Sequence, residues 1–249
     1  MNHEYPRILA HCGNREKYTE NGLMAFEYSL AHGITGFETD LRMTADGVVV
    51  VIHDSDISGT TLGKGIVEQM TLQQLKRIKL KYSDETIPTV EEMMSLFTSL
   101  NDFIFELEMK PLYGEYTPER MDEFLNKLYF AAQTHLSHGC FIFTSVAQDV
   151  LRRMKTLHPD AKTGLITFCG LDSKTIAAAL ELGCYSVATT LKGTEKQFVD
   201  QAKKLGLKVN LWHAENLELW LNARVLGADA STSNHPVALL NAIREYANL

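Results

Sequence analysis

The sequence predicts an α/β fold, a (β/α)8 barrel of the TIM class, from three observations. Short runs of β-branched and apolar residues alternate with longer segments of helical period along most of the chain. Eight of these runs can be strands, most are followed by a helix, and eight such βα units close into a barrel. The length of 249 residues is also the usual size of one such barrel.

The predicted elements follow one another in a regular order. The strands, which are short and apolar, are expected at 7–10, 37–43, 103–109, 141–145, 163–167, 185–190, 207–212 and 228–233. The helices, which carry an apolar face, are expected at 20–31, 118–135, 148–157, 172–182, 194–205 and 216–225, with a last helix ending near residue 247. Four glycines stand where a left-handed residue commonly ends a helix: Gly33, Gly183, Gly206 and Gly227. The rival fold, a doubly wound sheet, is disfavoured because no Gly-x-Gly-x-x-Gly loop follows the first strand.

Residues 56–100 interrupt this alternation after the second strand and its hairpin. The segment begins with the turn-rich run SGTTLGKG, and two short helices are expected in it, at about 71–79 and 89–99. No linker rich in Gly, Pro or Ser separates it from the rest of the chain. We therefore expect one domain over residues 1–249, in which residues 56–100 are a small insertion above the barrel mouth.

Composition narrows the class of protein. The net charge of −7 and the pI near 5.7 argue against nucleic acid or an anionic membrane as the main partner, since both require a basic face. The four cysteines show no Cys-x-x-Cys spacing and are expected to be small buried residues in a reducing compartment. No signal-peptide pattern and no apolar run of about 18 residues is present. We expect a soluble, cytoplasmic protein without stable membrane insertion; its oligomeric state stays open.

Ionisable residues lie at or near the carboxyl ends of the first three predicted strands. Because barrel active sites are built at that end, these side chains are expected to share one cleft. They are His11, Glu38, Asp40, Glu108 and Lys110.

A hairpin is expected to bring a second histidine to the same level. Residues 44–47 have turn chemistry, with a glycine at the end. If Met43 pairs with Val48, the register places Glu38 opposite His53. The two histidines are then natural candidates for a general acid and a general base near neutral pH.

The three carboxylates are expected to hold a metal ion. Glu38 and Asp40 are two residues apart in a strand and point to the same side, and Glu108 arrives from the next strand. Such groups repel one another unless a hard cation lies between them, and ligation by oxygen alone favours Mg²⁺ or Ca²⁺ over zinc. A metal and a lysine, Lys110, around one anion indicate a phosphate group.

The motifs together resemble the glycerophosphodiester phosphodiesterase family over nearly the whole chain. They are A-H-x-G (10–13), E-N (20–21), G-x₄-E-x-D-x₃-T-x-D-G-x₂-V-x₂-H-D (33–54), T-T-x-G-x-G (60–65), I-P-T-x-E-E (87–92), E-x-K (108–110) and G-L-K-V-x-x-W (206–212). The resemblance implies a TIM barrel and the metal-dependent hydrolysis of glycerophosphodiesters to glycerol 3-phosphate and an alcohol.

The resemblance also implies roles for single residues. A neighbouring glycerol hydroxyl would attack phosphorus while one histidine takes its proton and the other protonates the leaving alcohol. The matching positions are Glu38, Asp40 and Glu108 as metal ligands, His11 and His53 as the acid/base pair, and Lys110 as a phosphate contact. Trp212 ends a strand, where it is expected either to wall the glycerol pocket or to pack at the barrel mouth.

The chain departs from the family pattern beside the first histidine. The pattern His-Arg-Gly is here His11-Cys12-Gly13, so a guanidinium that would bind phosphate through two hydrogen bonds is missing. Arg15 is a candidate substitute from the same loop; without one, phosphate binding is expected to weaken by about 1–3 kcal/mol. Glu106 stands where relatives often carry Asn and is expected to be protonated, paired with Lys110, or in contact with the metal.

Two alternatives to the hydrolase stay open. A barrel that has lost the arginine would bind a phosphodiester without turning it over. A lyase-type phosphodiesterase would use the same histidines and metal but stop at a cyclic phosphate. Release of glycerol 3-phosphate with and without EDTA separates these classes.

Overall fold

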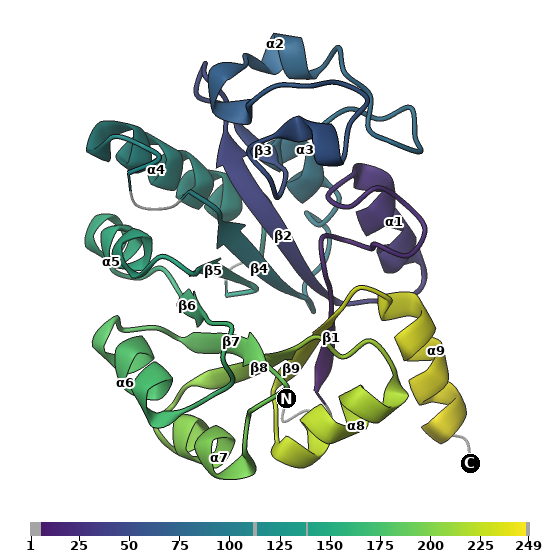
Figure 1. Cartoon of the computed structure of the whole chain (residues 1–249), viewed down its shortest axis with the longest axis vertical. Helices are drawn as coiled ribbons and strands as arrows, with labels where there is room; N and C mark the ends of the chain where they lie inside the picture. Colours follow the sequence, from purple (N-terminus) through teal and green to yellow (C-terminus); the bar gives the residue numbers. More distant parts are fainter. Residues whose placement is uncertain (1–5, 112–113, 138, 248–249) are drawn as a thin grey trace.

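The computed structural model describes residues 6–111, 114–137 and 139–247. Eight parallel strands form a closed barrel in which each strand pairs with the next and β1 pairs with both β2 and β9 (Figure 1). The barrel strands are β1 Arg7–Ala10, β2 Gly36–Met43, β4 Ile104–Met109, β5 Phe141–Ser145, β6 Thr163–Ile166, β7 Ser186–Thr190, β8 Lys208–Trp212 and β9 Ala230–Ser233. The predicted barrel is confirmed, with strand bounds within two residues of those expected.

Helices surround the barrel on its outer side (Figure 1). They are α1 Leu23–Ala31, α3 Val90–Ser95, α4 Pro118–His135, α5 Gln148–Leu157, α6 Ser173–Glu181, α7 Lys196–Lys204, α8 Leu217–Leu226 and α9 Pro236–Ala247. Helix α1 begins three residues later than predicted, because Asn21 has a φ of 62°, which a right-handed helix excludes. Gly227 ends α8 in the left-handed region, as expected, and the other three predicted glycines also have positive φ.

The core lies between the outer faces of the strands and the inner faces of the helices. Beside β2 and β4 it contains fully buried phenylalanines whose rings meet edge to face, with Phe97 4.9 Å from both Phe37 and Phe105. Each such aromatic pair contributes about 0.5–1.5 kcal/mol beyond the burial of its surface. These packed rings support the outer faces of β2 and β4, the two strands that carry the predicted carboxylates.

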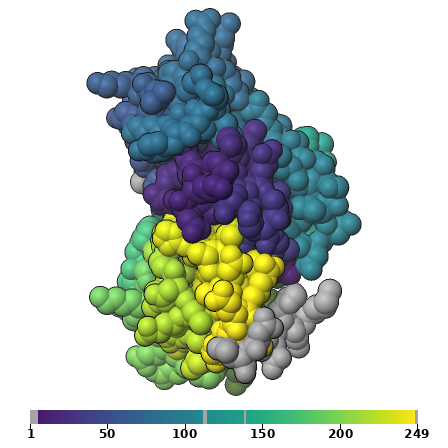
Figure 2. Space-filling model, turned by 90° about the vertical axis from the view of Figure 1, so that its right-hand side faces the viewer, coloured from purple at the N-terminus to yellow at the C-terminus, as the bar shows by residue number. Residues whose placement is uncertain are grey.

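The segment after β2 has two parts. Strand β3 Val49–Val51, η1 Ile57–Gly59, η2 Val67–Gln69 and α2 Leu72–Leu75 surround a small apolar core of their own, formed by Val50, Ile52, Ile57, Val67, Leu75, Leu80 and Ile87. Helix α3 instead contributes Met93 and Met94 to the main core and contacts α4. Residues 90–100 are therefore barrel wall, and the part that protrudes, seen at the upper end of Figure 2, ends before α3. We propose that the whole chain forms one domain.

The hairpin register differs from the predicted one by one residue. Strand β3 pairs antiparallel with β2, with Met43 opposite Val49 and not Val48. The reason is the turn, in which the Thr44 N–H donates to Val48 O at 2.9 Å and the Val48 N–H donates to Thr44 Oγ1 at 2.9 Å. Val48 is thereby used to close the turn. The predicted pairing of Glu38 with His53 is wrong. A side-chain contact with the His53 backbone, described below, helps to place this histidine at the site.

Candidate active site

Three buried carboxylates converge at the carboxyl ends of β2 and β4. Asp40 and Glu108 are direct neighbours across the two parallel strands, and Glu38 lies two residues before Asp40. One oxygen of each lies within 4.8 Å of the others. Glu38 Oε1 and Asp40 Oδ1 are buried and have no hydrogen-bond partner in the described part of the chain. Unsatisfied buried oxygens are costly, so this cluster is suited to a cation.

Burial and mutual repulsion set the protonation of the cluster. Burial raises the pKa of Glu38 well above its usual value, and the charges of Asp40 and Glu108 act in the same direction. Burial and Asp40 also raise the pKa of Glu108. Burial acts to raise the pKa of Asp40 as well, but Lys110 and the two histidines outweigh it, so the pKa of Asp40 is lowered. Asp40 is therefore the carboxylate of the cluster that most readily carries the negative charge.

Lys110 lies against these carboxylates. Its Nζ is 2.9 Å from Glu108 Oε1 and 3.5 Å from Asp40 Oδ1. Burial acts to lower the pKa of Lys110, but the charges of Asp40 and Glu108 raise it on balance. Lys110 is therefore a fixed positive charge at the edge of the site, suited to an anionic oxygen.

His11 follows β1 and is held in one tautomer by two residues. Its Nδ1 lies 2.6 Å from Asn234 Oδ1, while Asn234 Nδ2 donates to Glu215 Oε1 at 2.7 Å. Because the Glu215 carboxylate takes the amide NH₂, Oδ1 faces the ring and Nδ1 is the donor. The Nε2 lone pair is left free, 3.7 Å from Glu38 Oε2. Burial lowers the pKa of His11, which favours the neutral ring.

His53 stands at the mouth, 41% exposed, on the chain that leaves the hairpin. Its Nδ1 lies 2.7 Å from Asp54 Oδ1, and its Nε2 lies 3.0 Å from Lys110 Nζ. Arg42 holds its backbone in place, since Arg42 Nε donates to His53 O at 2.8 Å and Nη1 donates to Glu68 Oε1 at 3.1 Å. Arg42 on β2 positions this histidine, together with the backbone hydrogen bond that the neighbouring Ile52 N–H donates to Asp40 O at 2.9 Å.

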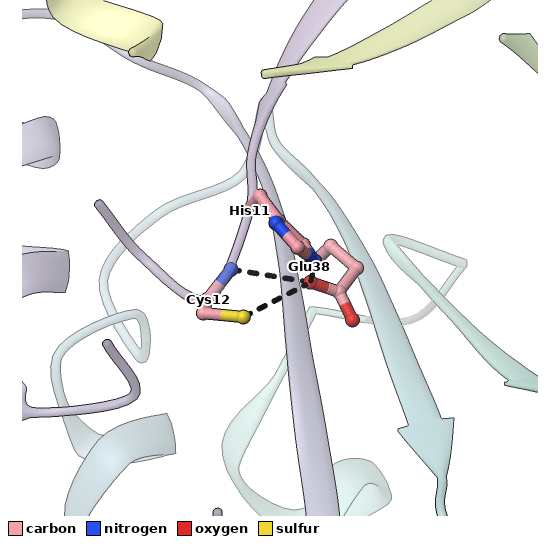
Figure 3. A group of neighbouring side chains, drawn as sticks. All are labelled: His11, Cys12 and Glu38. Carbon is pink, nitrogen blue, oxygen red and sulfur yellow. Dashed lines mark hydrogen bonds and ion pairs between the residues drawn. The ribbon is translucent and has the colours of Figure 1, made fainter. Parts of the chain in front are cut away.

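The loop after β1 closes over the carboxylates from the other side. Asn21 Nδ2 donates to Asp40 Oδ2 at 2.8 Å. The Cys12 backbone N–H donates to Glu38 Oε2 at 3.1 Å (Figure 3). Burial raises the pKa of the Cys12 thiol well above its usual value, so the thiol keeps its proton and donates it to Asp40 Oδ2 at 3.1 Å. Arg15, the candidate substitute for the missing arginine, is paired with Glu20 at 2.6 Å.

A cavity of about 170 Å³ joins these groups. Six of the seven predicted site residues line it, namely His11, Glu38, His53, Glu108, Lys110 and Trp212. Asp40 is fully buried behind them. The Trp212 ring meets Phe168 edge to face at 5.4 Å, and Phe168 is 69% exposed at the rim. One wall of the cavity is therefore aromatic and the opposite wall is charged.

Glu106 lies at the floor of the cavity. Its Oε2 accepts a 2.9 Å hydrogen bond from Asn210 Nδ2, which is a different partner from the expected Lys110. Burial raises the pKa of Glu106 to about 7. The carboxyl group is thus close to half protonated at neutral pH.

Four polar residues of the site were not assigned a role from the sequence: Asn21, Arg42, Asn210 and Asn234. Two of them carried a usable signal. Asn234 directly follows the last strand, and Arg42 is two residues beyond Asp40 on the same strand, where the strand period places it on the same side.

Comparisons with known sequences and structures give the relatives of this chain. The sequence pattern described as the glycerophosphoryl diester phosphodiesterase family matches residues 11–238. A glycerophosphodiester phosphodiesterase of Caldanaerobacter subterraneus is 30% identical over 244 residues, which cover 96% of this chain and 98% of that protein.

Solved structures are also similar. A phosphodiesterase of Oleispira antarctica, determined with its product sn-glycerol-3-phosphate, superposes with a TM-score of 0.85 at 26% identity and covers 96% of this chain and 97% of its own. A glycerophosphodiester phosphodiesterase of Thermotoga maritima shares the fold, with a TM-score of 0.76 at 22% identity, covering 98% of this chain and all of its own. The chain therefore belongs to the glycerophosphoryl diester phosphodiesterase family, as its motifs predict.

Proposed function

We propose that the chain hydrolyses glycerophosphodiesters to sn-glycerol 3-phosphate and an alcohol. The observation that carries the proposal is one cavity that holds a carboxylate cluster, a fixed lysine and the Nε2 atoms of two histidines. The similar phosphodiesterase of Oleispira antarctica, determined with the product sn-glycerol-3-phosphate, supports the identity of the product.

Glu38, Asp40 and Glu108 would hold one divalent cation, Mg²⁺ or Ca²⁺. The residues fit such an ion because one oxygen of each carboxylate lies within 4.8 Å of the others, and because Glu38 Oε1 and Asp40 Oδ1 are buried without a hydrogen bond in the described chain. The bound ion would supply a positive charge that polarises a phosphoryl oxygen. Asn21 would keep Asp40 directed toward the ion.

Each remaining side chain has a separate task in this proposal. Lys110 binds a phosphate oxygen, and Trp212 walls the side of the cavity that receives the glycerol. His11 acts as the base, because its Nε2 is unprotonated and the ring is buried. His53, more exposed at the mouth, protonates the alcohol that leaves, after Lys110 has moved from His53 Nε2 to the phosphate and Nε2 has taken up a proton; Asp54 orients its ring.

The proton and bond changes balance over two steps. His11 takes the proton of a glycerol hydroxyl, whose oxygen forms a bond to phosphorus while the bond to the departing alcohol breaks. The alcohol leaves with a proton from His53, and a cyclic phosphate remains. Water, deprotonated by His53, then opens the ring, and His11 returns its proton to the glycerol oxygen.

The test is the release of glycerol 3-phosphate from glycerophosphocholine. We expect release with Mg²⁺ or Ca²⁺ and loss of release with EDTA, restored by adding the cation back. Binding of glycerophosphocholine without any product would instead support the binding barrel, and a cyclic phosphate that persists would support the lyase.

Two further expectations from the sequence concern membrane insertion and the location of the protein in the cell. Along the described residues, no helix is long and apolar enough to cross a membrane. The cytoplasmic location stays a prediction.

A further inference from the structure

A second group of metal-ligating atoms lies beside the carboxylate cluster. His11, Cys12 and Glu38 each direct one ligand atom into a small volume, and these atoms lie within 4.8 Å of one another (Figure 3). Glu38 is common to both groups, whereas His11 and Cys12 have no part in holding the proposed Mg²⁺ or Ca²⁺. The donors are one nitrogen, one sulfur and one carboxylate.

We propose that His11, Cys12 and Glu38 form a second binding site, which shares Glu38 with the carboxylate cluster and takes a thiophilic divalent cation of the zinc class, and that such a cation inhibits the enzyme. The inhibition follows from the ligand set, because a cation bound to His11 Nε2 occupies the lone pair that would accept a proton. The proposed inhibition rests on the proposed function, whereas the proposed binding of the cation does not.

The spacing of the donors fits a small tetrahedral ion. Glu38 Oε2 lies 3.7 Å from His11 Nε2 and 3.9 Å from Cys12 Sγ. Two ligands at about 2.0–2.3 Å from a tetrahedral zinc ion are about 3.3–3.8 Å apart, so small rotations of the three side chains suffice. A fourth position would stay open to the cavity, which His11 and Glu38 both line.

The surroundings already orient the ligands. Asn234 accepts the His11 Nδ1–H and is itself held by Glu215, an arrangement that aims Nε2 at the site. The Cys12 backbone N–H fixes Glu38 Oε2 at 3.1 Å. The Glu38 side chain is almost wholly buried, and its other oxygen has no hydrogen bond within the described chain. The carboxylate therefore keeps a buried oxygen without a hydrogen bond, which is unused ligand capacity at the inner end of the cavity.

The sulfur decides which cation is preferred. Mg²⁺ and Ca²⁺ take oxygen ligands, whereas a thiolate and an imidazole suit zinc. When the cation binds, the Cys12 thiol proton, now directed at Asp40 Oδ2, leaves to solvent and the sulfur binds as thiolate. The thiolate and the divalent cation together add one positive charge beside the three carboxylates, which lowers their repulsion.

The binding test uses Co²⁺ and Zn²⁺ on the full chain in excess Mg²⁺. We expect Co²⁺ to give a near-ultraviolet sulfur-to-cobalt charge-transfer absorption in the wild type and in Cys169→Ser, a control that removes an exposed thiol. Cys12→Ser is expected to lose this absorption and about tenfold or more of its Zn²⁺ affinity. Equal absorption and affinity in Cys12→Ser and wild type would overturn the site.

A measurement on the unaltered protein guards against misfolding of the variant. X-ray absorption of the zinc-loaded wild type is expected to show one sulfur neighbour at about 2.3 Å together with nitrogen and oxygen at about 2.0 Å. A shell of nitrogen and oxygen alone would contradict the proposal, whatever the variants do.

The inhibition test measures turnover with saturating Mg²⁺ while Zn²⁺ is added, each protein relative to its own zinc-free rate. We expect progressive loss in the wild type and in Cys169→Ser, and resistance in Cys12→Ser. Equal inhibition of all three would refute the inhibitory role. If the protein shows no turnover at all, the proposed function fails, but the absorption measurements still decide the binding site.

Discussion

Asn234 Oδ1 lies 2.6 Å from His11 Nδ1, and Asn234 is held in turn by both oxygens of Glu215. This contact joins β9 to β1 across the seam where the barrel closes. It fixes the His11 tautomer and leaves Nε2 as the acceptor. Asn234 is thus a positioning residue for the proposed base.

Replacement of Asn234 by alanine is expected to lower kcat about 10–100-fold and to change KM little, because the base is misdirected while the carboxylates and Lys110 stay in place. Steady-state kinetics on glycerophosphocholine measure this. Asn101→Ala, a change at an exposed position far from His11 in the sequence, serves as control. An Asn234→Ala enzyme with normal kcat would show that the tautomer is fixed by something else.

Loss of either histidine is expected to separate turnover from cation binding. His11→Ala and His53→Ala are each predicted to lower kcat by about 10²–10⁴-fold, the usual contribution of a general acid or base. Mg²⁺ or Ca²⁺ affinity, measured by calorimetry, is expected to stay within a few-fold because carboxylates hold the ion. A variant that keeps full activity, or that no longer binds the cation, would disprove the assigned role of that histidine.

The strand pattern predicted the carboxylate cluster well, for a physical reason. Glu38, Asp40 and Glu108 lie on regular parallel strands, where a period of two residues and a neighbouring strand decide direction and level. To predict which side chains meet, one needs to know only which strands are neighbours, and the order of the βα units gives this. The three oxygens therefore meet as the sequence predicts.

The histidines and their partners could not be derived in the same way. The expected hairpin register failed because the Thr44 side chain bonds within the turn, which shifts the pairing by one residue. His53 instead depends on Arg42 and Glu68, and the Glu68 contact crosses 26 residues of chain. Contacts between side chains of irregular segments follow no repeating pattern in the sequence, so the sequence alone does not predict them.

Glu106 is expected to make stability depend on pH. Its pKa is about 7 in the folded chain against an ordinary 4.5, so the folded state binds the proton more tightly than the unfolded one. The contribution of Glu106 to the free energy of unfolding is then greatest below about pH 4.5 and falls as pH rises to about 7. At pH 8 the ionised group lowers the free energy of unfolding by roughly 3 kcal/mol.

Glu106→Gln is the matched variant, since an amide oxygen can still accept from Asn210. In EDTA, we expect the variant to be more stable than wild type at pH 8 and similar to it below about pH 5. Urea unfolding at the two pH values measures the difference. A variant less stable at pH 8 would mean that the carboxylate is stabilised by a contact that this account lacks.

Cys12→Arg is expected to lower KM for simple glycerophosphodiesters. A guanidinium beside Glu38 would add a bidentate phosphate contact that contributes about 1–3 kcal/mol to binding. Cys12→Met, which adds length without charge, separates the two effects. A KM above the wild-type value in Cys12→Arg, and in Cys12→Met as well, would indicate that the small residue makes room for a different alcohol group.

The central claim is that Glu38, Asp40 and Glu108 bind one divalent cation together. Anomalous diffraction from crystals soaked with Mn²⁺, a stand-in for Mg²⁺, tests it most directly. We predict a single strong peak within coordination distance of all three carboxylates. Saturating Mn²⁺ with no peak among them, or a peak held by other residues, would contradict the account.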